Sequence, residues 1–125
     1  MIHLDTSYLI RAMRSGADEE RQLRDWIREG VELAISSAAW TEYLCGPIDP
    51  SVAKDLLSFL NEPLPFMRLD AELAAELFNQ SGRRRRSTID CMIAAAAIRA
   101  EAGLATSDLA DFRRFVPAGL SIVNE

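Results

Sequence analysis

The first ten residues of the chain, positions 1–10, have the sequence MIHLDTSYLI, a short apolar run followed by a polar pair and more apolar residues. Residues 1–4 have the length and apolarity of a buried strand. Asp5 and Thr6 come next, and both residue types are common at the start of a helix. A strand that leads directly into a helix is the beginning of a β–α–β unit.

The same alternation of strand and helix recurs along the rest of the chain. Apolar residues at helical spacing, with Gly and Pro at the ends, predict the helices, and short apolar runs predict the strands. The predicted helices cover residues 6–15, 18–29, 36–44, 50–61, 70–79, 87–101 and 108–115. Further strands are predicted over residues 32–36, 66–69, 104–106 and 120–123. This order predicts an α/β domain spanning residues 1–125, with a parallel sheet covered by helices on both faces.

Charge and composition exclude some functions. The 125 residues include 14 Lys and Arg against 19 Asp and Glu, a formal net charge of −5. A protein that coats nucleic acid or membranes through bulk positive charge is therefore excluded. Four consecutive cations, Arg83 to Arg86, nevertheless form a local basic run. Such a run is either a solvated loop or a lip that binds phosphate.

Cysteine and histidine usage limits the choice of metal and compartment. Two cysteines, Cys45 and Cys91, are too few for a disulfide scaffold, and both are expected to be inert core thiols. The single histidine, His3, excludes a zinc site built from several histidines. The first ten residues lack the basic leader of a signal peptide, and the longest apolar stretch, residues 91–98, is too short to span a bilayer. A cytoplasmic protein is therefore expected.

Four acidic residues fall where a parallel sheet carries its function, beyond the carboxyl ends of the strands. Asp5 and Asp108 follow the predicted strands 1–4 and 104–106. Glu42 lies on the helix after the second strand, and Asp90 lies in the first turn of the helix that leads into strand 104–106. Each of the three aspartates could also serve only as a helix cap or first-turn acid.

Capping explains Glu42 and Asp90 less well. Both have small apolar neighbours on their predicted helix faces, which suggests packing, and a buried carboxylate without a partner is costly. No Lys or Arg is placed in the sequence to serve both. A divalent cation such as Mg²⁺ or Mn²⁺ would neutralise the clustered carboxylates and could support hydrolysis of a phosphodiester. The acids therefore indicate a metal-dependent phosphodiesterase.

Four segments together resemble the PIN-domain nucleases, and within them the VapC-type toxins of toxin–antitoxin pairs. The segments are LDTSYLI at residues 4–10, WTEYL at 40–44, STIDCMIAAAAI at 87–98 and ATSDLADF at 105–112. The resemblance covers almost the whole chain. It implies a three-layer α/β/α sandwich with a short parallel sheet, and an endoribonuclease that cleaves single-stranded RNA with Mg²⁺ or Mn²⁺. It also implies a cognate antitoxin that silences the enzyme, a homodimer, and a toxin–antitoxin hetero-oligomer.

The resemblance also implies roles for particular residues. The catalytic acids it indicates are Asp5, Glu42, Asp90 and Asp108, of which Asp5, Asp90 and Asp108 would hold the metal. Asp111 is an alternative or supporting ligand, because this sequence has an acid at both positions. Thr6, Ser7 and Thr106 would supply hydroxyl groups around the ligands. The basic run itself, which precedes Asp90, separately predicts that Arg83, Arg84, Arg85 and Arg86 contact RNA phosphates or the antitoxin.

The remaining features are assigned more ordinary roles. Arg99, Arg113 and Arg114 are expected on the surface, and His3 is expected to be structural. The aromatic residues are expected to serve in packing. Two apolar stripes are candidate contacts with a second subunit or the antitoxin: Trp26 with Ile27, or Val52 with Leu56 and Leu60.

Several alternatives of similar size can be compared. A receiver domain needs paired acids after the first strand and a lysine at a later strand end, but the only lysine is Lys54, in mid-helix. A dehalogenase-type phosphatase needs Asp-x-Asp where this chain has Asp5, Thr6 and Ser7. A catalytically inactive or DNA-directed nucleic-acid-binding module of the same fold remains the alternative function.

Overall fold

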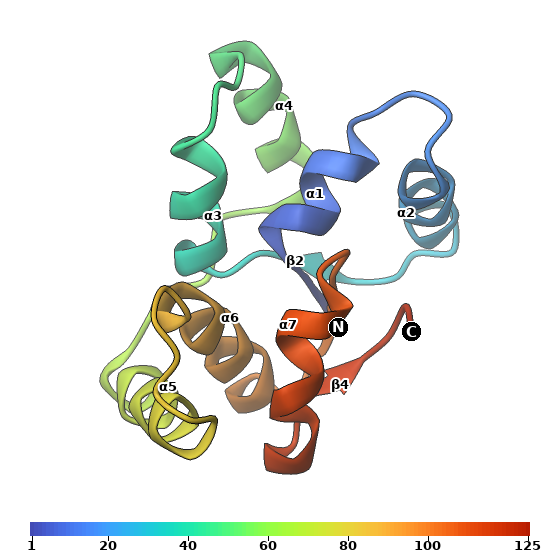
Figure 1. The fold of residues 1–125 in the computed structure, drawn as a ribbon. Helices are drawn as coiled ribbons and strands as arrows, with labels where there is room; N and C mark the ends of the chain where they lie inside the picture. The colour runs from blue at the N-terminus through green and yellow to red at the C-terminus, as the bar shows by residue number, and fades with distance from the viewer.

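Four short strands form one parallel sheet in the computed structural model, which describes residues 1–125 (Figure 1). The strands are β1 (Ile2–Leu4), β2 (Leu33–Ala34), β3 (Gly103–Ala105) and β4 (Ser121–Ile122), in the order β2-β1-β3-β4. The first strand is therefore internal: Ile2 lies opposite Leu33 on one side and opposite Gly103 on the other. All pairs are parallel, so the carboxyl ends of the strands share one edge.

Seven α-helices surround this sheet and confirm the predicted α/β class. They are α1 (Thr6–Ala12), α2 (Asp18–Arg28), α3 (Ser37–Leu44), α4 (Pro50–Leu60), α5 (Arg68–Gln80), α6 (Thr88–Arg99) and α7 (Leu109–Phe112). A 3₁₀ helix over Arg113–Ala118 continues α7. In Figure 1, α5 and α6 lie side by side on one flank, whereas α1 and α2 lie together on the other.

The helix α6 lies in the centre of the hydrophobic core because its side chains are small. Cys91, Ile93 and the alanines at 94–97 are all buried, and most of them belong to one cluster that includes residues of β1 and β3. Alanine is also the best helix former, so the sequence favours both the helix and its close packing. The start of α6 is thereby held beside the edge of the sheet.

Two parts of the predicted layout were wrong. Residues 66–69 are not a strand: the only strand-like pairing nearby is a bridge between Ser36 and Leu64, and α5 already begins at Arg68. The Asp70 carboxylate accepts a hydrogen bond from the backbone N–H of Met67 (2.8 Å), which starts the helix early. Cys45 was predicted in the core but is exposed, whereas Cys91 is buried as predicted.

Arg99 was predicted on the surface and is instead part of a partly buried ion pair. Its Nε donates to Oδ1 of Asp70 (2.7 Å), a residue only 6% exposed. The pair joins the end of α6 to the start of α5. Arg113 is exposed as expected and pairs with Glu125. None of the helices combines the length and the apolarity needed to cross a membrane.

Candidate active site

Asp5 lies at the end of β1 and is 2% exposed. It occupies the N-cap position of α1, but its side chain makes no capping hydrogen bond. Its Oδ2 instead accepts hydrogen bonds from the hydroxyl groups of Ser7 (2.6 Å) and Thr106 (2.8 Å). Because Thr106 follows β3, the carboxylate is held across the edge of the sheet, and the simple capping explanation fails.

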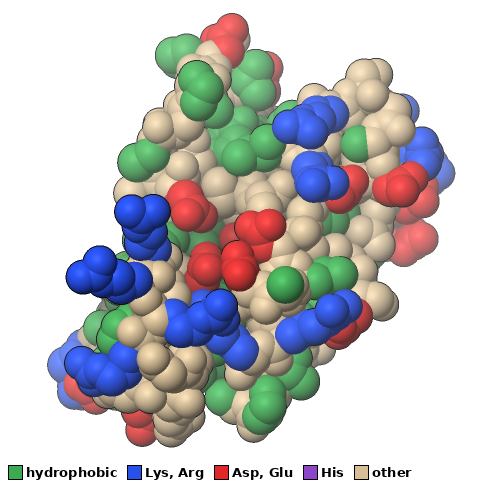
Figure 2. Space-filling model, viewed as in Figure 1, with side chains coloured by type: hydrophobic (Ala, Val, Ile, Leu, Met, Phe, Trp, Pro, Cys, Tyr) green, Lys and Arg blue, Asp and Glu red, His purple; other side chains and the backbone are tan.

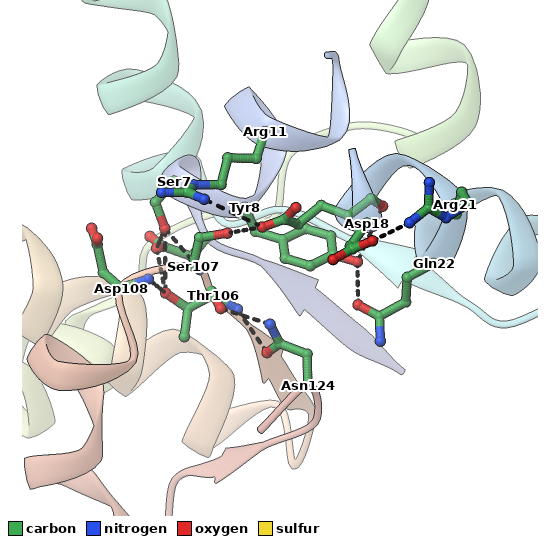
Figure 3. Close-up of polar contacts among 12 residues, drawn as sticks. Ser7, Tyr8, Arg11, Asp18, Arg21, Gln22, Thr106, Ser107, Asp108 and Asn124 are labelled. Carbon is green, nitrogen blue, oxygen red and sulfur yellow. Dashed lines mark hydrogen bonds and ion pairs between the residues drawn. The ribbon is translucent and has the colours of Figure 1, made fainter. Parts of the chain in front are cut away.

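Hydrogen bonds to Asn124 and to Ser7 hold the loop after β3 in place (Figure 3). The side chain of Asn124 donates to the Thr106 carbonyl (2.7 Å) and accepts from the Thr106 N–H (3.1 Å). The backbone N–H of Ser107 donates to the Ser7 hydroxyl (3.1 Å), and that of Asp108 donates to the Thr106 hydroxyl (3.0 Å). These bonds fix Ser7 and Thr106 next to Asp5.

Thr6 differs from the other two hydroxyl residues. Its hydroxyl donates to the backbone carbonyl of Ala39 (3.0 Å), so it ties α1 to α3 and contacts no carboxylate. Thr6 lines the same pocket, and its place around the ligands stays a prediction.

The four predicted catalytic acids line one pocket. Its walls are formed by Asp5, Glu42, Asp90 and Asp108, together with Thr6, Ser7 and Ile10. Figure 2 shows acidic side chains gathered near the centre of one face, with basic side chains around them. Glu42 and Asp108 are exposed and Asp90 is half-buried. Glu42 therefore does not lie on a packed face, contrary to the prediction from its small neighbours.

Burial and repulsion between carboxylates raise the pKa of Asp5 and of Asp90. Burial raises the pKa of Asp5, the bonds from Ser7 and Thr106 lower it again, and the nearby Glu42 and Asp108 raise it further. Burial also raises the pKa of Asp90 to about 7, with further upward contributions from Asp5, Asp111 and Glu42 and a downward one from Arg114. The pocket therefore has more negative charge than the protein compensates.

The raised pKa of Asp90 predicts an unusual pH dependence of stability. Its folded value of about 7 exceeds the ordinary 3.8, so the folded state prefers the protonated acid. Without metal, the free energy of unfolding should fall as pH rises from about 4 to about 7, by a few kcal/mol. We expect Asp90→Asn to flatten this profile in urea denaturation with EDTA present.

The matched control is Asp55→Asn, which changes an exposed acid on α4 and should leave the profile unchanged. A wild-type profile that stays level between about pH 4 and pH 7 would contradict the buried charge at Asp90.

A second pocket adjoins the first and is lined only by polar residues. Its walls are Arg84, Arg85, Arg86, Ser87, Asp90, Asp111 and Arg114. Arg83 does not belong to it: its side chain bonds to Asn79 and stacks over Phe78 on α5. The structure thus separates Arg83 from the other three arginines of the run.

Arg114 is the main residue that sequence reasoning missed. It was predicted on the surface, but its side chain is 15% exposed, and its Nη2 lies 3.9 Å from Oδ2 of Asp90. Its guanidinium lies over the Phe115 ring at 4.6 Å. The available signal was its position three residues after Asp111, which places both on one helical face.

The structure places the two candidates for the fourth acid, Asp108 and Asp111, in different pockets. Asp108 lines the carboxylate pocket with Asp5, Glu42 and Asp90, whereas Asp111 lines the arginine pocket. Asp108 occupies the N-cap position of α7 without making a side-chain cap, so capping does not explain it either.

The donor set can be compared with what metal ions require. No three Asp, Glu, His or Cys side chains stand close enough together to enclose one ion between them. The pocket nevertheless offers only oxygen donors and uncompensated carboxylates. That combination fits a cation such as Mg²⁺, which keeps several waters and takes only one or two carboxylates directly. It does not fit a closed zinc site.

Comparisons with known proteins give consistent matches. The family model described as "PIN domain" matches residues 2–116. The solved VapBC2 from Rickettsia felis, bound to a promoter DNA fragment, is 25% identical with TM-score 0.76 and covers 100% of this chain and 99% of its own. FitAcB from Neisseria gonorrhoeae is 21% identical with TM-score 0.73, covering 99% and 97%. A toxin–antitoxin complex from Klebsiella pneumoniae is 23% identical with TM-score 0.71, covering 90% of each chain. A sequence comparison with curated proteins finds no match.

Proposed function

The chain belongs to the PIN-domain family, and we propose that it is a metal-dependent endoribonuclease that acts as the toxin of a toxin–antitoxin pair. The observation that carries this proposal is the pocket shared by Asp5, Glu42, Asp90 and Asp108 at the carboxyl edge of the sheet. The side chains of Asp5 and Asp108 occupy capping positions without capping, so their placement needs another explanation.

The proposed reaction divides the work among the acids. Asp5, Asp90 and Asp108 would hold Mg²⁺ or Mn²⁺, one or two of them directly and the rest through the waters that the cation keeps, with Asp5 kept in orientation by Ser7 and Thr106. The cation supplies positive charge that stabilises the negative charge developing on the phosphodiester. Glu42 is exposed at the same pocket, where its carboxylate is available to accept a proton from the attacking water.

The ionisation of Asp90 limits when the site can work. An acid with a pKa near 7 is only partly ionised at neutral pH, and only the ionised form attracts a cation. Cation binding and ionisation of Asp90 therefore favour each other. The proposed enzyme should bind its metal more tightly as the pH rises through about 7.

Cleavage of matched RNA and DNA tests the proposal directly. Purified protein is incubated with a single-stranded RNA and with the DNA of the same sequence, in Mg²⁺, in Mn²⁺ and in EDTA. We expect cleavage of the RNA alone, and only with a divalent cation. Cleavage of the DNA alone would favour the DNA-directed alternative, and cleavage of neither would favour the inactive binding module.

The proposed antitoxin contact is an apolar groove between α1, α2 and α4. Its lining includes Met13, Leu23, Ile27, Val52, Leu56 and Phe59. Ile27, Val52 and Phe59 are exposed, and Phe59 is 54% exposed. Ile27 of one predicted stripe and Val52 of the other therefore lie on one surface, whereas Trp26 packs against the core. Leu60 is buried in the core and does not line the groove, and Leu56 lines it but is only 2% exposed. Contrary to the prediction, these two side chains therefore offer little surface to a partner.

An apolar segment of the cognate antitoxin is the proposed occupant of this groove. Two of the solved neighbours are named as a VapBC pair and a toxin–antitoxin complex. The groove is mostly apolar, with charges only from Glu20, Arg24 and Asp55. Exposed apolar side chains that line one groove mark a contact with another protein.

Phe59→Asp is expected to weaken antitoxin binding by about 100-fold or more, because it places a charge in an apolar contact. The partner is the product of the adjacent gene, co-expressed and measured by titration. The control is Leu69→Asp, which alters an exposed leucine on α5 outside the groove. RNA cleavage by the free protein should not change.

We also expect a homodimer by light scattering. If Phe59→Asp dissociates that dimer and leaves the antitoxin bound, the groove is the subunit interface instead.

A further inference from the structure

The arginine pocket is a structured part of the molecule that the proposed catalysis leaves unused. It is lined by Arg84, Arg85 and Arg86 from the loop before α6, by Ser87 and Asp90 at the start of α6, and by Asp111 and Arg114 from the last helical segment. No hydrophobic side chain lines it. Asp90 also lines the carboxylate pocket, so the two pockets are contiguous.

Arg114 is the most informative residue in this pocket. Its Nε and Nη2 are buried and have no hydrogen-bond partner. The distance of 3.9 Å to Asp90 is too long for a hydrogen bond, and stacking on Phe115 holds the guanidinium in place. Buried N–H groups without partners are uncommon and costly, so a partner is expected from outside the chain.

The rest of the pocket also favours an anion. None of the protein's ion pairs involves Arg84, Arg85 or Arg86, whose side chains are exposed. The Ser87 hydroxyl donates to the Arg84 carbonyl (2.7 Å) and does not cap α6. The first turn of this 12-residue helix therefore keeps N–H groups that attract negative charge.

We propose that Arg84, Arg85, Arg86 and Arg114 form a phosphate subsite that binds the RNA phosphodiester adjacent to the one being cleaved. This inference rests on the proposed function and names how the substrate is held. Arginine presents a planar set of donors that matches phosphate oxygens. Phosphate oxygens would satisfy the buried N–H groups of Arg114 and draw it away from Asp90, which is then free to hold the cation.

The contiguity of the two pockets favours RNA over an acidic protein segment. An RNA strand carries a phosphate at every nucleotide, so a strand with one phosphate in the arginine pocket has a neighbouring phosphate to offer to the carboxylate pocket, which shares Asp90 with it. An acidic protein segment could fill the arginine pocket, but it has no phosphodiester to present at the carboxylate pocket, so it would leave the proposed catalytic site unused.

The salt dependence of RNA binding tests the subsite. The probe is a short fluorescein-labelled oligouridine, measured by anisotropy with EDTA present so that no cleavage occurs. Each single-stranded phosphate contact contributes about 0.7 to the slope of log affinity against log salt. The double variant Arg84→Gln with Arg85→Gln should reduce that slope by about 1.4, and Arg114→Gln by about 0.7.

A matched control removes the same charge elsewhere. Arg28 and Arg68 are exposed on α2 and α5, outside both pockets, and the double change of these two residues to Gln should leave the slope unchanged. Arg114→Lys keeps the charge without the planar donors, so it should restore the slope but not the full affinity. Arg84 and Arg85 are exposed, so their double variant tests the subsite even if Arg114→Gln does not fold.

The possible outcomes test the phosphate subsite independently of the proposed nuclease activity. An unchanged slope in the Arg84 and Arg85 double variant overturns the subsite, as does equal weakening by the Arg28 and Arg68 control. A poly-glutamate peptide that binds as tightly as the oligouridine and depends on the same arginines overturns the assignment to RNA. Reduced slopes in a protein that cleaves no RNA support the subsite and contradict the nuclease.

Discussion

Asp5→Asn is expected to reduce RNA cleavage by about 10³-fold or more while the folded protein becomes more stable in the absence of metal. Asparagine has the same shape, and its carbonyl oxygen can accept the bonds now made by Ser7 and Thr106. The change removes only the charge. That charge is the most deeply buried of the four acids, and its raised pKa shows that the charged form destabilises the fold.

Rates are measured on the RNA that the wild-type protein cleaves, with Mn²⁺, and stability is measured by thermal unfolding in EDTA. Ser7→Ala is the graded comparison: it keeps the charge and removes one orienting bond, so a loss of about 10 to 100-fold is expected. Asp18→Asn, an exposed acid on α2, is the neutral control. Activity above about a tenth of wild type in Asp5→Asn would contradict the role of Asp5.

Asp108→Asn should reduce cleavage by about 100-fold or more, whereas Asp111→Asn should reduce it only a few-fold. Asp108 shares the pocket with the other three acids, and Asp111 lines the arginine pocket instead. Calorimetry with Mn²⁺ gives a second measurement, in which Asp108→Asn weakens binding and Asp111→Asn does not.

The pair of variants is its own control, because both replace an exposed aspartate in the same short segment. An inactive Asp111→Asn with an active Asp108→Asn would reverse the assignment of the fourth acid. Loss of activity in both would mean that Asp111 also takes part in holding the cation.

The sequence predicted the sheet and the meeting of the acids because both follow from local patterns. A strand that leads into a helix fixes where its carboxyl end lies, so the order of the elements alone places Asp5 and Asp108 at one edge of the sheet. The short strands also paired as a parallel sheet, as the alternation with helices requires.

The errors arose where a local pattern does not determine which side of a helix is covered. Glu42 has small neighbours on α3, and small residues suit both a packed face and an open one, so its exposure could not be inferred. Cys45 was misplaced for the same reason. The apolar run at 66–69 has strand-like composition, but the Asp70 carboxylate accepts a hydrogen bond from the Met67 N–H and so stabilises a helix that begins at Arg68.

Arg114 could not be identified from spacing alone because its importance depends on distant contacts. Its neighbour Arg113 has the same chemistry and is exposed, pairing with Glu125. Only the packing of the last helical segment against the start of α6 turns Arg114 toward Asp90. Spacing places Arg114, but not Arg113, on the same helical face as Asp111, and only the tertiary structure shows that Arg114 reaches Asp90.

The pairing of β1 with β3 has a consequence for the order of folding. Ile2 pairs with Gly103, and one of the two hydroxyl groups that orient Asp5 comes from Thr106, so the surroundings of the first strand stay incomplete until residues 103–106 are available. Closing such a long loop costs entropy before any contact offsets it, and distant contacts of this kind slow folding. During synthesis, a nascent chain that has emerged only as far as α5 carries Asp5, Ser7 and Glu42 but lacks β3 and the Thr106 hydroxyl. The pocket should therefore assemble only after β3 and the loop that follows it have left the ribosome.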